Sequence, residues 1–293
     1  MLVADSASNS ELARIEKVLS SGQPFLPKDF ESLKSILAKF PHTTRVIESY
    51  KSALIKREDW AALADFLIAQ PPGKLSRTDR ANLARAALRL GRYDDVITTA
   101  KPLVDEDPND VDTASILASG YYNIGRMDES AAIFDRHWSA IVDQKRISEI
   151  TLRGLIHHRQ GNDEKAIEVL LKSAELSPDN ITALNTLSRI YNAHGDLARA
   201  EEFRRRNEAA QAKQAAEAAR AHHQVQMLYE LQDKWEQQKF TDVIIIARKA
   251  IESATESNKP VLYQYIAESY SKLGRPQDAR AALMEIERLK QKQ

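Results

Sequence analysis

The chain of 293 residues contains no cysteine, which excludes disulfide bonds, thiolate nucleophiles and cysteine-bound metals. It also has no surplus of either charge, because Lys and Arg together number 42 and so do Asp and Glu. An attraction of the whole molecule to nucleic acid or to an anionic membrane is therefore not expected. Any electrostatic preference has to come from local clusters of charge.

Long apolar runs are missing as well. No stretch of about 18 apolar residues occurs, so we expect no membrane-spanning helix. The first residues have neither a basic start nor an apolar segment behind it, unlike a signal peptide. We expect a cytoplasmic protein. The alternative is a periplasmic or membrane-anchored soluble domain from which a leader has been removed.

The usual motifs of catalysis and cofactor binding are not found. Every glycine stands alone, so there is no glycine-rich phosphate loop. The two adjacent pairs His157–His158 and His222–His223 chelate one metal poorly, because neighbours in a helix point about 100° apart. We therefore predict no enzyme activity, no cofactor and no metal site.

Glycine is scarce but regularly placed. Gly91, Gly125, Gly161 and Gly195 follow one another at steps of 34, 36 and 34 residues, and Gly274 follows after 79. The last step fits two repeats with about nine additional residues, and a period in the mid-thirties is typical of stacked helical arrays. Such arrays usually offer surfaces to partners rather than pockets for chemistry.

Each of these glycines lies between two helical patterns, where it can take a positive φ and end the first helix. Small residues recur seven positions before and five positions after the glycine, where paired helices approach closely. They are Ala84, Ala118, Gly154, Ser188 and Ala267 before it, and Val96, Ser130, Ala166, Ala200 and Ala279 after it. Pro108 and Pro178 each follow their glycine by 17 residues and end the second helix. An unrelated helical bundle has no reason to keep this period.

This pattern resembles the tetratricopeptide repeat, a helix–turn–helix unit of 34 residues. The resemblance is clearest over residues 77–208 and 260–290. It implies an all-α fold, a right-handed superhelical solenoid of helix–turn–helix repeats. Weaker repeats begin at Thr44 and near Met227, where Gln238 replaces the glycine.

From these segments we expect four parts: an atypical N-terminal repeat or cap (1–43), the repeat array (44–208), a long connecting helix (197–238) and a C-terminal repeat pair (224–293). The cap is predicted from segment 10–40, which Gly22, Pro24 and Pro27 split in two. The long helix is predicted because neither glycine nor proline occurs between Gly195 and Pro260, where strong helix formers dominate.

The long helix carries a narrow stripe of small residues at three- and four-residue steps. The stripe consists of Ala209, Ala212, Ala216, Ala219 and His223. One interpretation is a solvated spacer between two parts of the array. The other is a pairing face, used within the chain or with a second copy.

In tetratricopeptide repeat proteins the first helix of each repeat lines a concave surface to which partner peptides bind. The resemblance, carried over by register, makes ten residues candidates for partner binding: Asn82, Arg85, Arg89, Tyr122, Asn123, His158, Arg159, Asn185, Arg189 and Asn192. The lining has four arginines against one aspartate, Asp112. Because arginine binds carboxylates through two hydrogen bonds, we predict a groove for an acidic segment. The alternative is that these arginines are merely solvated or pair with neighbouring acids.

One subtype of the family can be compared directly. Its chaperone-binding members hold two carboxylates with Lys, Asn, Asn, Lys and Arg at set positions of the groove. The matching residues here are Thr78, Arg85, Ile116, Ser148 and Leu152, so this clamp is not present.

We therefore predict a non-enzymatic scaffold or adaptor in a multiprotein assembly, which binds a protein or peptide with acidic segments. Nucleic-acid binding and direct membrane insertion are not expected. One alternative is a self-assembling structural component of a secretion or envelope machine, joined through residues 209–223. The other is a regulatory or targeting subunit of a larger enzyme complex.

Overall fold

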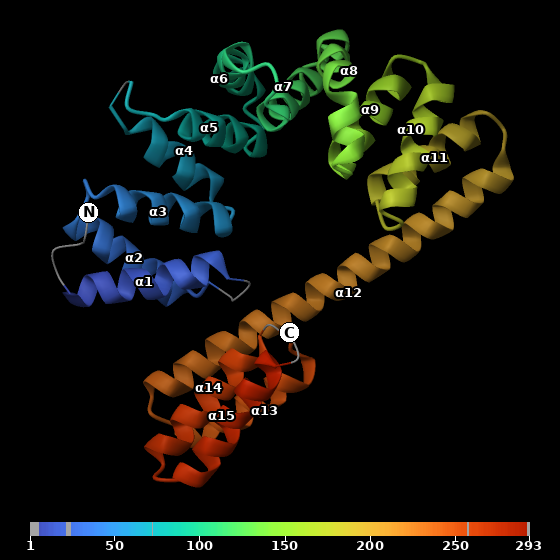
Figure 1. Ribbon diagram of the computed structural model, residues 1–293. Coiled ribbons are helices and arrows are strands. Elements are labelled where there is room, and N and C mark those ends of the chain that lie inside the picture. The colour runs from blue at the N-terminus through green and yellow to red at the C-terminus, as the bar shows by residue number, and fades with distance from the viewer. Residues whose placement is uncertain (1–5, 22–24, 72, 257, 292–293) are drawn as a thin grey trace. The chain divides into compact units, whose positions relative to one another are not determined.

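The computed structural model describes residues 6–21, 25–71, 73–256 and 258–291, which form fifteen α-helices and confirm the all-α prediction (Figure 1). The predicted break at Gly22 and Pro24, and residues 1–5 of the predicted cap, lie outside the described residues. The helices are α1 (Ser6–Ser20), α2 (Pro27–Lys39), α3 (Thr44–Lys56), α4 (Trp60–Ile68), α5 (Arg77–Arg89), α6 (Tyr93–Glu106), α7 (Val111–Asn123), α8 (Met127–Asp143), α9 (Ile147–Arg159), α10 (Asp163–Leu176), α11 (Ile181–Ala193), α12 (Leu197–Glu236), α13 (Phe240–Ser253), α14 (Lys259–Lys272) and α15 (Pro276–Lys290).

The chain divides into two compact units. We call residues 54–213 the central unit, and residues 1–53 together with 214–293 the terminal unit. The boundaries fall inside α3 and inside α12. The four-part division expected from the sequence stays a prediction.

In the central unit each helix from α4 to α11 packs against the next one along the chain. The first helices of successive repeats, α5, α7, α9 and α11, also pack against one another. Figure 1 shows α5, α7 and α9 on the inner side of the arc that this unit forms, with α6 and α8 on the outer side. We call the surface formed by α5, α7, α9 and α11 the inner face.

The recurrent glycines lie where the sequence places them, in the turns between paired helices. Gly125 has a φ of 85° and lets the Arg126 N–H donate to the Tyr121 carbonyl at 2.9 Å, which closes the end of α7. The step of 36 residues also has a cause. The second helices α6 and α10 stop before a proline, whereas α8 continues to Asp143 and is followed by a turn in which Lys145 has a φ of 52°.

The small residues on either side of each turn bring the paired helices together. Ser130 Oγ donates to the Ala118 carbonyl at 2.8 Å, and both residues are fully buried. Gly154 shows how little room there is, because a Cβ at this position would come within 2.6 Å of Leu170 Cγ. The close contact between α9 and α10 therefore depends on the missing side chain.

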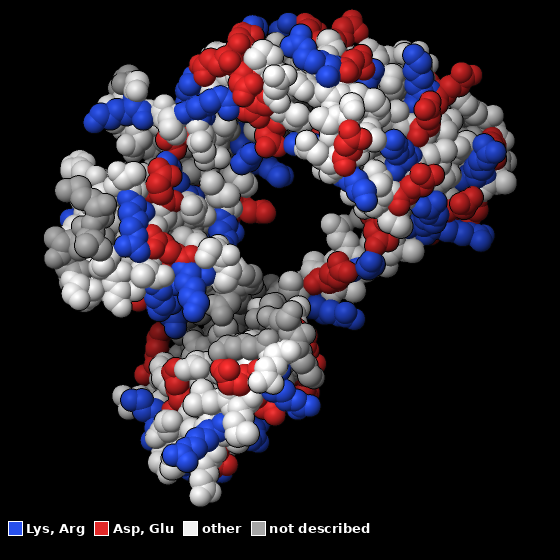
Figure 2. Space-filling model, in the orientation of Figure 1, with Lys and Arg blue, Asp and Glu red and all other residues white. Residues whose placement is uncertain are grey.

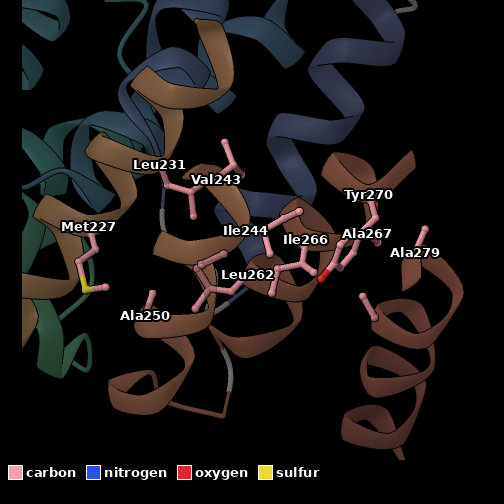
Figure 3. Close-up of a cluster of buried hydrophobic side chains, with 12 residues drawn as sticks. Met227, Leu231, Val243, Ile244, Ala250, Leu262, Ile266, Ala267, Tyr270 and Ala279 are labelled. Atoms are coloured by element: carbon pink, nitrogen blue, oxygen red, sulfur yellow. The ribbon is translucent and has the colours of Figure 1, made fainter. Parts of the chain in front are cut away.

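The terminal unit has its own apolar core, to which α12, α13, α14 and α15 contribute (Figure 3). Met227 and Leu231 come from the end of α12 and pack with Val243 and Ile244 of α13, and with α14. The predicted long helix is confirmed as α12, which has 40 residues. Its residues 211–223 are exposed on every side, which includes most of the stripe of small residues.

Candidate functional site

A cavity of about 530 Å³ opens on the inner face where α5, α7 and α9 meet. All three helices contribute side chains, because each presents one face to the neighbouring first helices and one to solvent. The lining consists of Arg85, Leu88 and Arg89 from α5, Asp112, Ser115, Ile116 and Ser119 from α7, and Arg146, Ser148, Glu149 and Leu152 at and after the start of α9. The cavity therefore combines apolar side chains with charged and hydroxyl-bearing ones.

Two predicted site residues, Arg85 and Arg89, form the α5 wall of this cavity, one helical turn apart. Arg85 Nη1 donates only a long hydrogen bond, 3.4 Å, to Oδ1 of the predicted residue Asn82. The Arg89 guanidinium lies over the Trp60 ring, 5.7 Å from its centroid. Neither arginine forms an ion pair with an acid among the described residues, so both retain unused N–H donors.

The opposite wall carries two acids and only one arginine. Arg146, which precedes α9, lies 2.7 Å from an Asp112 carboxylate oxygen and 2.6 Å from one of Glu149. Asp112 is 69% exposed, so much of its charge is screened by solvent, whereas Glu149 is largely buried. The two acids of the cavity are thus already held by one arginine. The unbalanced positive charge lies on the α5 wall.

Tyr122 and Arg159 meet on the inner face although they are 37 residues apart in the chain. The Arg159 guanidinium stacks 4.1 Å from the centre of the Tyr122 ring. Burial raises the pKa of the Tyr122 phenol, so the ring is neutral and its face attracts the cation. The neighbouring Asn123 is exposed and donates to the Ser119 carbonyl in its own helix at 2.8 Å.

His158 is engaged with Asp163 at the start of the following helix, α10. Its Nδ1 is 2.6 Å from one carboxylate oxygen of Asp163, and His194 Nε2 is 2.9 Å from the other. These contacts join the end of α9, the start of α10 and the end of α11. The hydrogen bond to His158, and after it that to His194, lowers the pKa of the Asp163 carboxyl against the opposing effect of burial.

The remaining predicted residues, Asn185, Arg189 and Asn192, are exposed along one face of α11. They lie outside the cavity, and within the described part of the chain their side chains make no hydrogen bond or ion pair. Their spacing of four and three residues lines them up along the helix. They could therefore extend a binding surface from the cavity toward the end of the inner face.

Most other arginines of the central unit differ from these candidates by having acidic partners. The paired ones are Arg77, Arg80, Arg92, Arg126, Arg146, Arg153, Arg199, Arg204, Arg205 and Arg206. Figure 2 shows the result around α6, α7 and α8, where acidic and basic side chains are interspersed over the outer surface. Arg85, Arg89, Arg159 and Arg189 have no such partner among the described residues.

Sequence reasoning missed several residues of the cavity. Three of them could have been found from the sequence, because they occupy positions that match the family's carboxylate clamp. They are Ile116, Ser148 and Leu152, which line the cavity together with Arg85. Arg146 had no signal in the sequence, since it precedes its helix and its two acidic partners are separated by 37 residues. Trp60 had no signal either, because its contact with Arg89 depends on the packing of two repeats.

Elsewhere, a cavity of about 550 Å³ in the terminal unit includes the buried Asp29, whose carboxylate is already held by Arg14 at 2.6 Å and by the Leu26 N–H at 3.0 Å. No cluster of metal-ligating residues is present in the described part of the chain. None of the described helices is long and apolar enough to cross a membrane. The cytoplasmic location stays a prediction.

Comparison with known proteins agrees with the repeat pattern. Family models of the tetratricopeptide repeat match residues 82–138 and 150–180. A solved double mutant of MamA is similar over 59% of this chain and 96% of its own, with 17% identity and a TM-score of 0.50. A further MamA crystal structure covers 57% of this chain and 96% of its own, with 20% identity and a TM-score of 0.46.

YrrB, whose structure is described as that of a TPR protein with an unusual peptide-binding site, is similar over 60% of this chain and 85% of its own, with 17% identity and a TM-score of 0.45. No curated protein matches the chain. Together with the helix pairs and their turns, the two family matches identify the chain as a tetratricopeptide repeat protein.

Proposed function

We propose that this tetratricopeptide repeat protein is a non-enzymatic scaffold or adaptor that binds an acidic segment of a partner protein on its inner face. The observation that carries the proposal is the cavity between α5, α7 and α9, in which Arg85 and Arg89 have no acidic partner. Arginines that pair with neighbouring acids would not leave two adjacent guanidinium groups free on one wall.

The apolar part of the cavity supports the same function. Leu88, Ile116 and Leu152 offer a surface for an apolar side chain next to the acidic group of the partner. Arg159 stacked on Tyr122 supplies a further contact of the kind enriched at protein interfaces. A segment bound here is therefore held by apolar contacts and selected by its charge.

Affinity capture with the whole chain tests this proposal. Wild type is compared with Arg85→Glu/Arg89→Glu and with Arg136→Glu as a matched control, because Arg136 is an exposed arginine on α8 with no partner among the described residues. We expect the double variant to lose partners that the other two proteins retain, and this loss to be repeated with the purified partner. Retention of the same partners by all three proteins would reject the inner face as the binding surface.

Self-assembly is a second candidate, favoured by the full exposure of residues 211–223 of α12. If two copies pair through this segment, the change Ala212→Glu/Ala216→Glu/Ala219→Glu places charges in the contact and should yield monomers. Sedimentation equilibrium of the full chain measures this. A wild-type monomer at concentrations of about 100 µM, far above the Kd of a stable dimer, would reject it.

A further inference from the structure

The cavity on the inner face has more free hydrogen-bond donors than a carboxylate can use. Arg85 and Arg89 can each offer a bidentate edge, and the exposed Ser148 hydroxyl has no partner among the described residues. A carboxylate has about four acceptor sites on two oxygens, whereas two bidentate guanidinium edges and the hydroxyl offer five donors. Two free guanidinium groups one turn apart therefore match an anion with more oxygens and more charge.

We propose that the anchor of this cavity is a phosphorylated serine or threonine side chain of the partner segment. The inference rests on the proposed function and specifies its ligand. A phosphate monoester has three terminal oxygens and about 1.5 to 2 negative charges at neutral pH. Arg85 and Arg89 bind two of these oxygens from the α5 wall, and the third faces Ser148 at the start of α9.

The surroundings of Arg89 hold its guanidinium ready for this contact. It lies over the Trp60 ring, 5.7 Å from the ring's centroid, and this cation–π contact restrains the side chain. Arg85 is half-buried and is steadied by its long hydrogen bond to Asn82. Less side-chain freedom is lost on binding when the donors are already restrained.

The acids of the cavity limit where the phosphate can lie. Asp112 and Glu149 would repel it, but both are in contact with Arg146 on the opposite wall. The phosphate is therefore expected against α5, where the two arginines have no acidic partner among the described residues. The cavity lining also includes Ser115, whose Oγ is buried without a partner among the described residues and becomes a further donor if its side chain rotates.

The experiment uses three probes on the full chain: inorganic phosphate, N-acetyl-O-phosphoserine amide and N-acetylglutamate amide. Each is titrated at physiological salt while the Arg Nε–Hε signals are followed by NMR. We expect the phosphoserine probe to bind at least tenfold more tightly than the glutamate probe and to shift the signals of Arg85 and Arg89. Inorganic phosphate should compete with it.

Two variants decide whether binding occurs in this cavity. Arg85→Gln/Arg89→Gln should weaken phosphoserine binding at least tenfold, whereas Arg136→Gln should leave it unchanged. Equal affinity for the glutamate probe, no saturable binding, or unchanged binding to the double variant would each overturn the inference. Thermal unfolding of both variants, measured alongside, verifies that they are folded.

The outcome also separates this inference from the proposed function. If partner capture requires Arg85 and Arg89 but the phosphoserine probe shows no preference, the phosphate inference fails and the binding surface stands. If the phosphoserine probe binds as expected but the arginine variants capture the partner as well as wild type does, the cavity binds phosphate and the proposed function on the inner face fails.

Discussion

Two arginines of α9 lie six residues apart and meet opposite surroundings. Arg153 is only 10% exposed and its guanidinium is 2.6 Å from the Asp135 carboxylate on α8. Arg159 is exposed on the inner face, where it stacks on Tyr122 and has no acidic partner among the described residues. One contributes to the packing of neighbouring helices, and the other offers its donors to solvent.

The same contrast occurs within α5. Arg80 reaches across to α6 and forms two hydrogen bonds with Glu106, at 2.8 and 2.9 Å, whereas Arg85 and Arg89 on the same helix face the cavity. The difference teaches that the position of an arginine around the helix decides its role. Arg80 and Arg153 pair with acids of the second helices that flank their own, while Arg85 and Arg89 on the inner face have no acidic partner among the described residues.

The largest effect on stability is expected for Arg153. Replacement Arg153→Ala removes the contact with Asp135 and leaves a space among packed helices, so we expect a loss of about 2 kcal/mol in the free energy of unfolding. Arg153→Met, which fills the space without the charge, should recover part of it. Urea denaturation measures both. If Arg159→Ala costs as much as Arg153→Ala, the contrast between the two arginines is wrong.

An intermediate effect is expected for Asp163, which joins the ends of α9 and α11 through His158 and His194. Asp163→Asn should cost about 1 kcal/mol at neutral pH, because both hydrogen bonds lose the ionised acceptor. The pKa of Asp163 is lowered in the folded protein, so its contribution is present above the usual value of 3.8 and is lost as the pH falls through the folded value. Wild type and variant should therefore converge in stability on acidification. A constant difference down to pH 2 would contradict this.

The smallest effect is expected for the exposed pair of Arg80 and Glu106. Replacement Arg80→Gln should change the free energy of unfolding by about 0.5 kcal/mol or less, since solvent screens exposed ion pairs. Raising the salt concentration should shrink the difference further. Arg85→Gln and Arg89→Gln should be as mild for stability, yet should differ from Arg80→Gln in abolishing partner capture. If all three variants captured the partner equally well, Arg85 and Arg89 would not differ from Arg80 in partner binding.

Much of the fold follows from local sequence. A residue with positive φ must end each first helix, and the regular glycines supply it, as Gly125 shows. Where the glycine is missing, Glu58 and Gln238 take the same left-handed conformation, with φ of 54° and 57°, because the packing of the helix pair requires the turn. The helix–turn–helix repeat is therefore also formed where the glycine in the turn is missing.

The candidate site could be predicted only in part. The helical register placed Arg85, Arg89, Tyr122 and Arg159 on the first helices, and the structure leaves their donors or rings available there. It could not show that His158 is engaged with Asp163, or that Arg146 holds Asp112. The first contact depends on how the turn between α9 and α10 folds, and the second joins different repeats.

The sequence by itself determined the helix pairs, their turns, the long α12 and the residues that can reach the inner face, because each of these depends on spacings within one repeat. Only the tertiary structure decided which charges neutralise one another and which remain free. The reason is physical: an arginine's partner is set by the distance and direction across packed helices, and both arise when the repeats stack.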